Sequence, residues 1–346
     1  MTLSGREVFG AHYDEGRITR QTDVDPVWAH LANRSIENYK QLETESENLR
    51  KTQNTFTEDM FLDNKSLKSM FPYFDFSKDD IGYYMPVNAG YLNPRKQVMA
   101  QIIVASNQGC DVIRDTVTGI ILADNDKTHN HRIVTEKGKL IYAKKVLLAT
   151  GVFTEIHNLL PNHVRIKFKA MPQTVTQAQV SDDDARRLKD MPTFVYHGKG
   201  GEKWFEDYPK DVDGNVHFYF LPPIKYPDGK YYIKIGHSDS ILKGPLKKSE
   251  IQQWHCGGGD RNLENQLFLL LKSICKDSCA TMVTPSFRPY IDLVTQTFGV
   301  AIGGNGRAGK SSDEIGRLAA DMIVKSKWSG DISMECFKIN AKCSKL

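Results

Sequence analysis

The sequence predicts an α/β protein with two interleaved domains, one made of helices and sheet strands and the other built on a largely antiparallel sheet. Three observations support this fold class. Apolar residues recur at helical spacing near both ends of the chain. Short apolar runs between turn residues indicate strands beside those helices, and the middle region alternates between polar and apolar residues. With 346 residues, 40% of them hydrophobic, the chain can bury a sizeable core.

Capping residues mark the first two predicted helices. Asp25-Pro26 supplies an N-cap and a first-turn proline, which predicts a helix over 26–43. Asn93-Pro94 begins the second helix in the same way, and a glycine at position 109 ends it. The segment between them, from 51 to 85, is rich in aromatic and turn residues, and we expect it to form an irregular cap.

Strands are expected after the second helix. They are predicted over 110–115, 131–136, 139–143 and 145–151. The last of these is apolar on both faces, which predicts a central place in its sheet.

The middle and C-terminal regions give a second set of elements. Alternating segments predict antiparallel strands over 164–180, 215–223 and 230–238. A helix over 260–274, two strands over 289–294 and 298–304, and an amphipathic helix over 311–326 complete the expected order.

Composition excludes several classes of function. The 46 basic and 42 acidic residues give a net charge of +4 without a charged block, so neither a nucleic-acid tail nor a membrane-binding face is predicted. No apolar run is long enough to span a membrane, and no signal peptide is recognisable. The six cysteines form no C-x-x-C pair, which is typical of a reducing compartment and argues against a zinc site.

One motif has the spelling of a phosphate-binding P-loop. Gly304 is followed by four residues and then by Gly309-Lys310-Ser311, between a predicted strand and a predicted helix. Only about 35 residues follow, which leaves no room for the magnesium-binding strand and the rest of such a sheet. The motif therefore predicts an anion site made of backbone N–H groups, a helix N-terminus and a lysine. The alternative is a tight strand-to-helix turn with an exposed lysine.

The sequence ends in Ser344-Lys345-Leu346, which is the peroxisomal import address. We therefore expect a peroxisomal location and recognition by the peroxisomal import receptor. The alternative is that a lysine-rich tail ends in these letters by chance.

Several segments, in order along the chain, resemble the FAD-dependent amine and amino-acid oxidase family, especially its sarcosine oxidase and pipecolate oxidase branch. They are "FGAHYDEGRITR", "GYLNPRKQVMAQIIVASNQGCDV", "KKVLLATGVFT", "YYIKIGHS", "CATMVTPSFRPYID" and "GGNGRAGKSSDEIG". The resemblance implies FAD as the cofactor and a flavin-binding, doubly wound α/β domain interleaved with an antiparallel-sheet substrate domain. It places the FAD-binding domain at 1–50, 88–160 and 285–330, the substrate domain at 51–87 and 161–284, and a tail at 331–346.

The resemblance also implies roles for charged residues. Arg20 and Lys310 match the pair that holds the substrate carboxylate, for which a planar fork and a point charge are suited. Arg17 matches the arginine beside the flavin ring. Lys234 matches the lysine near the face of the flavin that reacts with O2, where positive charge favours electron transfer. Without the family match, both arginines would be interpreted as solvated loop charges, and Lys234 as an outward-facing strand lysine opposite an apolar core.

Further positions are implied to contact the cofactor. They are Thr150, Gly151, Cys279, Gly303, Gly304, Asn305, Gly306, Gly309 and Lys310. The turn from Gly303 to Gly309 would aim a helix N-terminus at the reduced flavin. Cys279 falls where some members attach the flavin through a thioether, and the alternative is a buried, inert thiol.

One expected part of the family pattern is missing from this sequence. A member should open with a strand, a G-x-G-x-x-G turn, a helix and an acidic residue, together about 30 residues. Residues 1–8 are too few for this unit, and its absence would expose Val146, Leu147 and Leu148 of the neighbouring strand. The hypotheses are a truncated form of an active oxidase, which the retained arginines and lysines favour, an inactive relative, or a rearranged site with weak flavin binding.

The function expected from these observations is a peroxisomal FAD-dependent oxidase. It would oxidise the C–N bond of a small secondary or N-methyl amino acid with O2, giving an imine and hydrogen peroxide. The alternative from another class is a catalytically inactive relative that acts as a peroxisomal interaction or regulatory protein.

Overall fold

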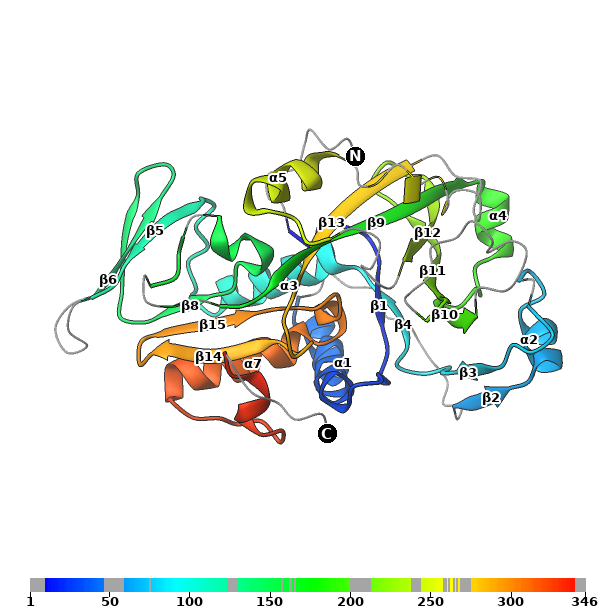
Figure 1. Cartoon of the computed structure of the whole chain (residues 1–346), viewed down its shortest axis with the longest axis horizontal. Helices are drawn as coiled ribbons and strands as arrows, with labels where there is room; N and C mark the ends of the chain where they lie inside the picture. Colours follow the sequence, from blue (N-terminus) through cyan, green and yellow to red (C-terminus); the bar gives the residue numbers. More distant parts are fainter. Residues whose placement is uncertain are drawn as a thin grey trace.

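The chain is described by a computed structural model of residues 10–46, 59–123 except 75, 130–199 except 157, 162–163 and 165, 213–237, 244–257, 260, 262–263, 265, 267 and 275–339. The predicted mixed α/β architecture with a large antiparallel sheet is confirmed (Figure 1). The predicted helix over 260–274 lies mostly outside the described residues.

A three-stranded sheet and two helices form one side of the molecule. The strands run in the order β14 (Tyr290–Thr295), β15 (Phe298–Ile302) and β8 (Val146–Leu148). Helix α7 (Ser312–Lys325) packs on this sheet, and α1 (Pro26–Ser46) packs on α7 (Figure 1). Trp28 and Leu31 of α1 meet Leu318 of α7 in one core cluster, as their helical spacing predicts.

The opposite face of this sheet packs against the rest of the molecule. Phe298, Val300 and Ile302 alternate along β15 and lie in a second core cluster with Ile251 of α5 (Lys248–Gly257). The 3-10 helix η2 (Gly151–Glu155), which follows β8, contributes Val152 to the same cluster. Alternation in β15 thus serves two cores, one on each face.

The prediction that the strand at 145–151 is central is wrong for the described residues. β8 pairs in parallel with β15 on one side, and no described strand pairs with its other side. Leu147 is 37% exposed, whereas Leu148 is buried. An apolar sequence does not by itself show that a strand is central in its sheet. Burial of one face of β8 by the η2 region is enough to favour apolar residues there.

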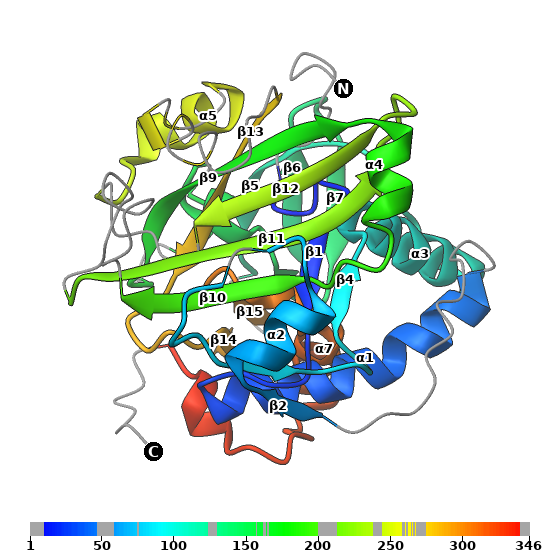
Figure 2. The same cartoon turned by 90° about the vertical axis from the view of Figure 1, so that its right-hand side faces the viewer.

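A five-stranded antiparallel sheet forms the second large layer. Its order is β10 (Phe194–Lys199), β11 (Asn215–Lys225), β12 (Tyr231–His237), β9 (Lys169–Val180) and β13 (Cys275–Val283) (Figure 2). The helix α4 (Asp182–Arg187) follows β9, with Ser181 as its N-cap. The antiparallel middle region is therefore as predicted.

Smaller elements connect and flank these layers. β1 (Arg17–Thr19) pairs with β4 (Gly90–Leu92), and β4 leads into α3 (Pro94–Asn107), which Asn93 caps as predicted. β5 (Val117–Ile121), β6 (His131–Thr135) and β7 (Leu140–Ala143) form a separate antiparallel meander. The 3-10 helix η5 (Met334–Phe337) lies near the C-terminal end.

Two predictions in these flanking regions need correction. The strand expected over 110–115 is not a strand, and β5 begins two residues later, at Val117. The segment expected to be an irregular cap contains β2 (Met60–Leu62), α2 (Asn64–Met70) and β3 (Gly82–Tyr84). Aromatic side chains of this segment pack together as a small core of their own, which stabilises regular structure there.

Candidate functional site

The segment from Asp14 to Asp23, which includes β1, runs between the two large layers (Figure 1). Gly16 lies against β11, where an added Cβ atom would come within 2.6 Å of Ile224 Cδ1. The Cβ of the next residue, Arg17, lies 3.4 Å from the place where a Cβ of Gly309 would be. The segment therefore connects the five-stranded sheet to the turn that precedes α7.

Lys234 of β12 is buried in a charged network with this segment. Its side chain is 1% exposed, and its Nζ lies 2.5 Å from Asp14 Oδ2 and 2.6 Å from the carbonyl oxygen of Gly16. Arg17 forms an ion pair with the same carboxylate, and the hydroxyl of Tyr226 donates to Asp14 Oδ1 at 3.0 Å. Two cations thus share one buried carboxylate.

The outward-facing alternative for Lys234 is therefore wrong. Its neighbours on β12, Ile233 and Ile235, pack in two core clusters, and strand alternation directs them to the face opposite Lys234. Both faces are nevertheless covered, because the segment around Asp14 and Gly16 lies over the face that carries the lysine. This cover comes from a part of the chain about 220 residues away, so local pattern could not reveal it.

Electrostatics favour the ionised form of Asp14. Burial alone would raise the pKa of its carboxyl group, but the charges of Lys234 and Arg17 and the hydrogen bonds from Lys234 and the Glu15 amide hold that pKa well below its usual range. A carboxylate that stays charged in a buried place depends on these partners.

A second charged cluster surrounds Asp23, whose side chain is 1% exposed. Lys310 Nζ lies 2.5 Å from Asp23 Oδ2, and an Nη atom of Arg307 lies 2.8 Å from Asp23 Oδ1. Arg20 donates from Nε to the carbonyl oxygen of Thr22, next to Asp23. The cluster thus brings together Arg20 and Lys310, and it adds two residues that were not predicted.

Lys310 is the most perturbed cation of this cluster. Burial lowers the pKa of its ammonium group to about 8, the ion pair with Asp23 opposes the shift, and the like charges of Arg20 and Arg307 add to it. The pKa of Arg20 is also lowered, by burial and then by Arg307, although Asp23 opposes this. The cluster is therefore rich in positive charge.

The glycine turn lies beside these cations in a conformation that favours glycine. Gly303 and Gly306 have φ angles of 85° and 69°, and Asn305 has 49°. Asn305 is held by its amide, which donates to Met282 O, and by its Oδ1, which accepts from the Thr284 amide. The turn is thereby fixed to the end of β13.

The sequence suggested that the turn leads directly into the helix, but the structure differs. The 3-10 helix η4 (Ala308–Lys310) lies between Gly306 and α7, so Lys310 is on η4. At the start of α7, the amide of Glu314 donates to Ser35 Oγ of α1. Part of the helix N-terminus is therefore satisfied within the protein.

Four of the remaining predicted positions follow two strands of the three-stranded sheet. Thr150 and Gly151 follow β8, and Gly303 and Gly304 follow β15. Because β8 and β15 are parallel, their carboxyl ends meet at one edge of the sheet, which is where open α/β sheets bind ligands.

Cys279 lies in β13, opposite Gln173 of β9. Its side chain and the terminal Ser344, Lys345 and Leu346 lie outside the described residues. The thioether and the import address stay predictions.

The polar groups of the described residues fit an anionic cofactor that can form hydrogen bonds. Two buried hydroxyl oxygens, Ser311 Oγ and Thr19 Oγ1, have no hydrogen-bond partner within the described part of the chain. Ser311 follows η4 and Thr19 ends β1, which η4 contacts. Unsatisfied buried hydroxyls are costly, so a polar ligand at this junction would stabilise the protein.

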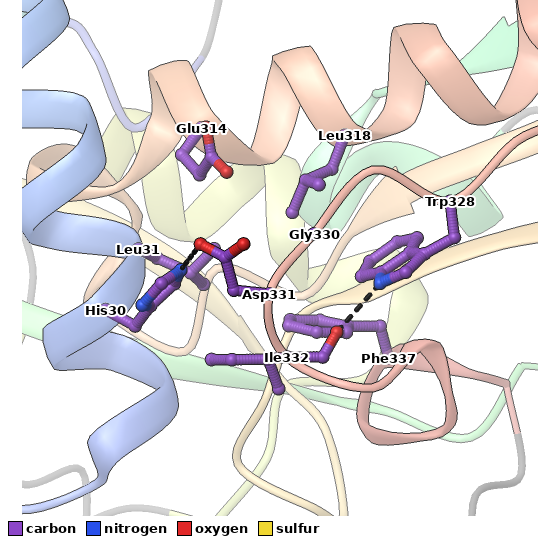
Figure 3. A pocket seen from close by; sticks show the side chains of 9 residues that line it. All are labelled: His30, Leu31, Glu314, Leu318, Trp328, Gly330, Asp331, Ile332 and Phe337. Carbon is purple, nitrogen blue, oxygen red and sulfur yellow. Dashed lines mark hydrogen bonds and ion pairs between the residues drawn. The ribbon is translucent and has the colours of Figure 1, made fainter.

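Three site residues were missed from the sequence. Asp14 and Asp23 flank the predicted arginines, and Arg307 lies inside the glycine turn. An acidic residue placed three positions from each arginine was the available signal, since opposite charges near buried cations are expected. A separate hollow, shown in Figure 3, lies between α1, α7 and the segment after α7, and none of its lining residues was predicted to be functional.

Comparisons with known proteins agree with this architecture. The sequence model of the family described as FAD dependent oxidoreductase matches residues 21–322. No curated protein matches the sequence. None of the described helices has the length and apolar character needed to cross a membrane.

Solved structures with a similar fold include three oxidoreductases. The open form of NikD, an amino acid oxidase of nikkomycin biosynthesis, is 15% identical with a TM-score of 0.68, over 95% of this chain and 87% of that one. L-proline dehydrogenase from P. horikoshii is 16% identical with a TM-score of 0.66, over 92% and 84%. A fructosyl amine:oxygen oxidoreductase from Aspergillus fumigatus is 14% identical with a TM-score of 0.64, over 94% and 79%. At these identities the likeness concerns the fold.

Proposed function

Because this chain belongs to the FAD-dependent oxidoreductase family, whose sequence model matches residues 21–322, we propose that it oxidises the C–N bond of a small secondary or N-methyl amino acid. O2 is the electron acceptor, and the products are an imine and hydrogen peroxide. When bound, FAD accepts the equivalent of a hydride from the substrate and supplies the electrons that reduce O2. The proposal is supported above all by segment 14–23, which joins the Lys234 network to the cation cluster beside the glycine turn.

The cation cluster binds the substrate carboxylate in this proposal. Arg20 presents a guanidinium fork, and Lys310 adds an ammonium group that is 6% exposed in its side chain. Asp23 holds Lys310 in place without cancelling the positive charge of the cluster. A carboxylate fixed here orients the substrate and excludes water from the cations.

Lys234 and Arg17 act at the other end of the segment. Lys234 supplies positive charge that favours the reduction of O2 by stabilising superoxide, and Arg17 lies beside the flavin ring. Asp14 keeps both cations in position through the shared carboxylate. Thr150, Gly151 and the turn from Gly303 to Gly309 hold the cofactor at the strand ends, and Cys279 is the candidate for covalent attachment.

Carboxylate binding should weaken as the pH rises through about 8, because Lys310 loses its proton in that range. Because the pKa is lowered, the Lys310 ammonium group is fully protonated below this range and neutral above it. The arginines stay charged throughout, and Asp23 is ionised well below it. Calorimetric titration with acetate between pH 6 and 10 measures the effect, and Lys310→Met should remove this pH dependence. A dependence that survives in Lys310→Met would contradict the assignment.

The glycine turn can be tested by a matched pair of substitutions. Gly303→Ala should weaken FAD binding about tenfold, because the alanine has to adopt a φ of 85° and its Cβ would lie 2.5 Å from Thr284 Cγ2. Gly138→Ala is the control, since Gly138 also has a positive φ but belongs to the β6–β7 turn with nothing within 4 Å. Equilibrium binding of FAD, followed by flavin fluorescence, compares the two.

Two outcomes of this experiment would count against the proposal. FAD binding that is equal in Gly303→Ala and Gly138→Ala would show that the turn does not hold the cofactor. A protein with no flavin absorbance even after incubation with FAD would remove the proposed activity. An absorption spectrum taken before and after acid precipitation also shows whether the flavin stays with the protein, as attachment to Cys279 requires.

A further inference from the structure

The Asp23 cluster carries more positive charge than one amino-acid carboxylate can neutralise. Arg20, Arg307 and Lys310 lie around the single carboxylate of Asp23. The like-charge effects described above show that the three cations act on one another, since Arg307 lowers the pKa of Arg20 and both arginines lower that of Lys310. Within the described residues, two positive charges therefore remain in excess after the pairing with Asp23.

The two cations that hold Asp23 bind different oxygens of its carboxylate. Lys310 contacts Oδ2 and Arg307 contacts Oδ1, so the carboxylate lies between them. Their surroundings also differ, because the Lys310 side chain is 6% exposed and that of Arg307 is 35% exposed. The cluster extends from a buried cation toward solvent, which suits a ligand with one charge inside and a second charge at the rim.

Partial burial makes such an excess of charge unfavourable without a ligand. Cations removed from water are stabilised by anions within hydrogen-bond reach, and guanidinium groups bind carboxylates through paired hydrogen bonds. A monocarboxylate would compensate one charge. A dicarboxylate of a few carbons would compensate both.

We propose that the substrate is a dicarboxylic amino acid with a secondary or N-methylated amine, and that Arg307 binds its second carboxylate. This inference rests on the proposed function for the chemistry at the nitrogen, but it concerns binding that needs neither flavin nor turnover. Arg307 is then the residue that determines specificity for the dicarboxylate.

The test compares two acids of four carbons, succinate and butyrate, by calorimetry on the full chain at constant ionic strength. We expect succinate to bind at least about tenfold more tightly than butyrate. Arg307→Gln should reduce this preference to less than about twofold, whereas Arg307→Lys should retain part of it. Arg186→Gln, at an exposed arginine of α4 that pairs with Asp183, is the matched control and should retain the full preference.

Three other outcomes overturn the inference. Equal binding of succinate and butyrate would mean that the excess charge does not select a dicarboxylate. A preference that persists in Arg307→Gln would place the second carboxylate elsewhere. Sulfate that binds as tightly as succinate, with the same dependence on Arg307, would identify a general oxyanion site. Succinate preference in a protein that oxidises no amine would instead refute the proposed function and leave the binding site intact.

Discussion

Asp14→Asn is expected to lower the free energy of unfolding by about 3–5 kcal/mol, because it leaves buried Lys234 without its carboxylate. Both side chains are 1% exposed, so water cannot replace the lost partner. Arg17 loses its carboxylate in the same change. Urea unfolding followed by circular dichroism measures the difference, with the slope of the transition checked for constancy.

Two variants separate the charge effect from a general effect of the substitution. Asp183→Asn removes the carboxylate of an exposed ion pair with Arg186 and should leave stability unchanged within error. The double variant Asp14→Asn with Lys234→Met should be more stable than Asp14→Asn alone, since it contains no buried ammonium group that has lost its carboxylate. An Asp14→Asn protein as stable as the unsubstituted one would contradict the network.

Lys234→Met is expected to slow the reaction of the reduced, FAD-loaded protein with O2 by about 10²–10³-fold. The reason is loss of the buried positive charge proposed to stabilise superoxide. Stopped-flow mixing of the anaerobically reduced protein with oxygenated buffer measures the rate directly, and it leaves substrate binding out of the comparison.

Lys230→Met is the matched control for this prediction. Lys230 lies just before β12, is exposed, and contacts Gln179 through its Nζ at 3.3 Å. The reduced Lys230→Met protein should react with O2 at the same rate as the unsubstituted protein. If Lys234→Met binds FAD and reacts equally fast, Lys234 has no part in the oxygen reaction.

The elements that the sequence predicted are those with strong local signals. Asp25-Pro26 and the apolar spacing after it predicted α1, and Asn93-Pro94 predicted α3, because capping and periodicity act within one or two turns. The alternating segments predicted β9, β11 and β12 for the same reason. The position of β8 at the edge of its sheet, among the described strands, was not predictable. The strand that pairs with it, β15, comes from a distant part of the chain.

The candidate site shows the same division. A family resemblance identified Arg20, Lys234 and Lys310, but their partners Asp14 and Asp23 were not singled out. Strand alternation placed Lys234 on the correct face and left its burial open, because burial depends on the segment that covers that face. The net charge around Lys310 likewise follows from residues about 290 positions apart, which no local pattern relates.

Anaerobic mixing of the FAD-loaded protein with secondary and N-methyl amino acids tests the central claim most directly. The measured quantity is the visible absorbance of the oxidised flavin over time. We expect a substrate of this class to bleach it at a rate that saturates with concentration, and admission of air to restore it with formation of hydrogen peroxide. A protein that holds FAD but whose spectrum is unchanged by every amino acid of this class would contradict the proposed oxidation of a C–N bond.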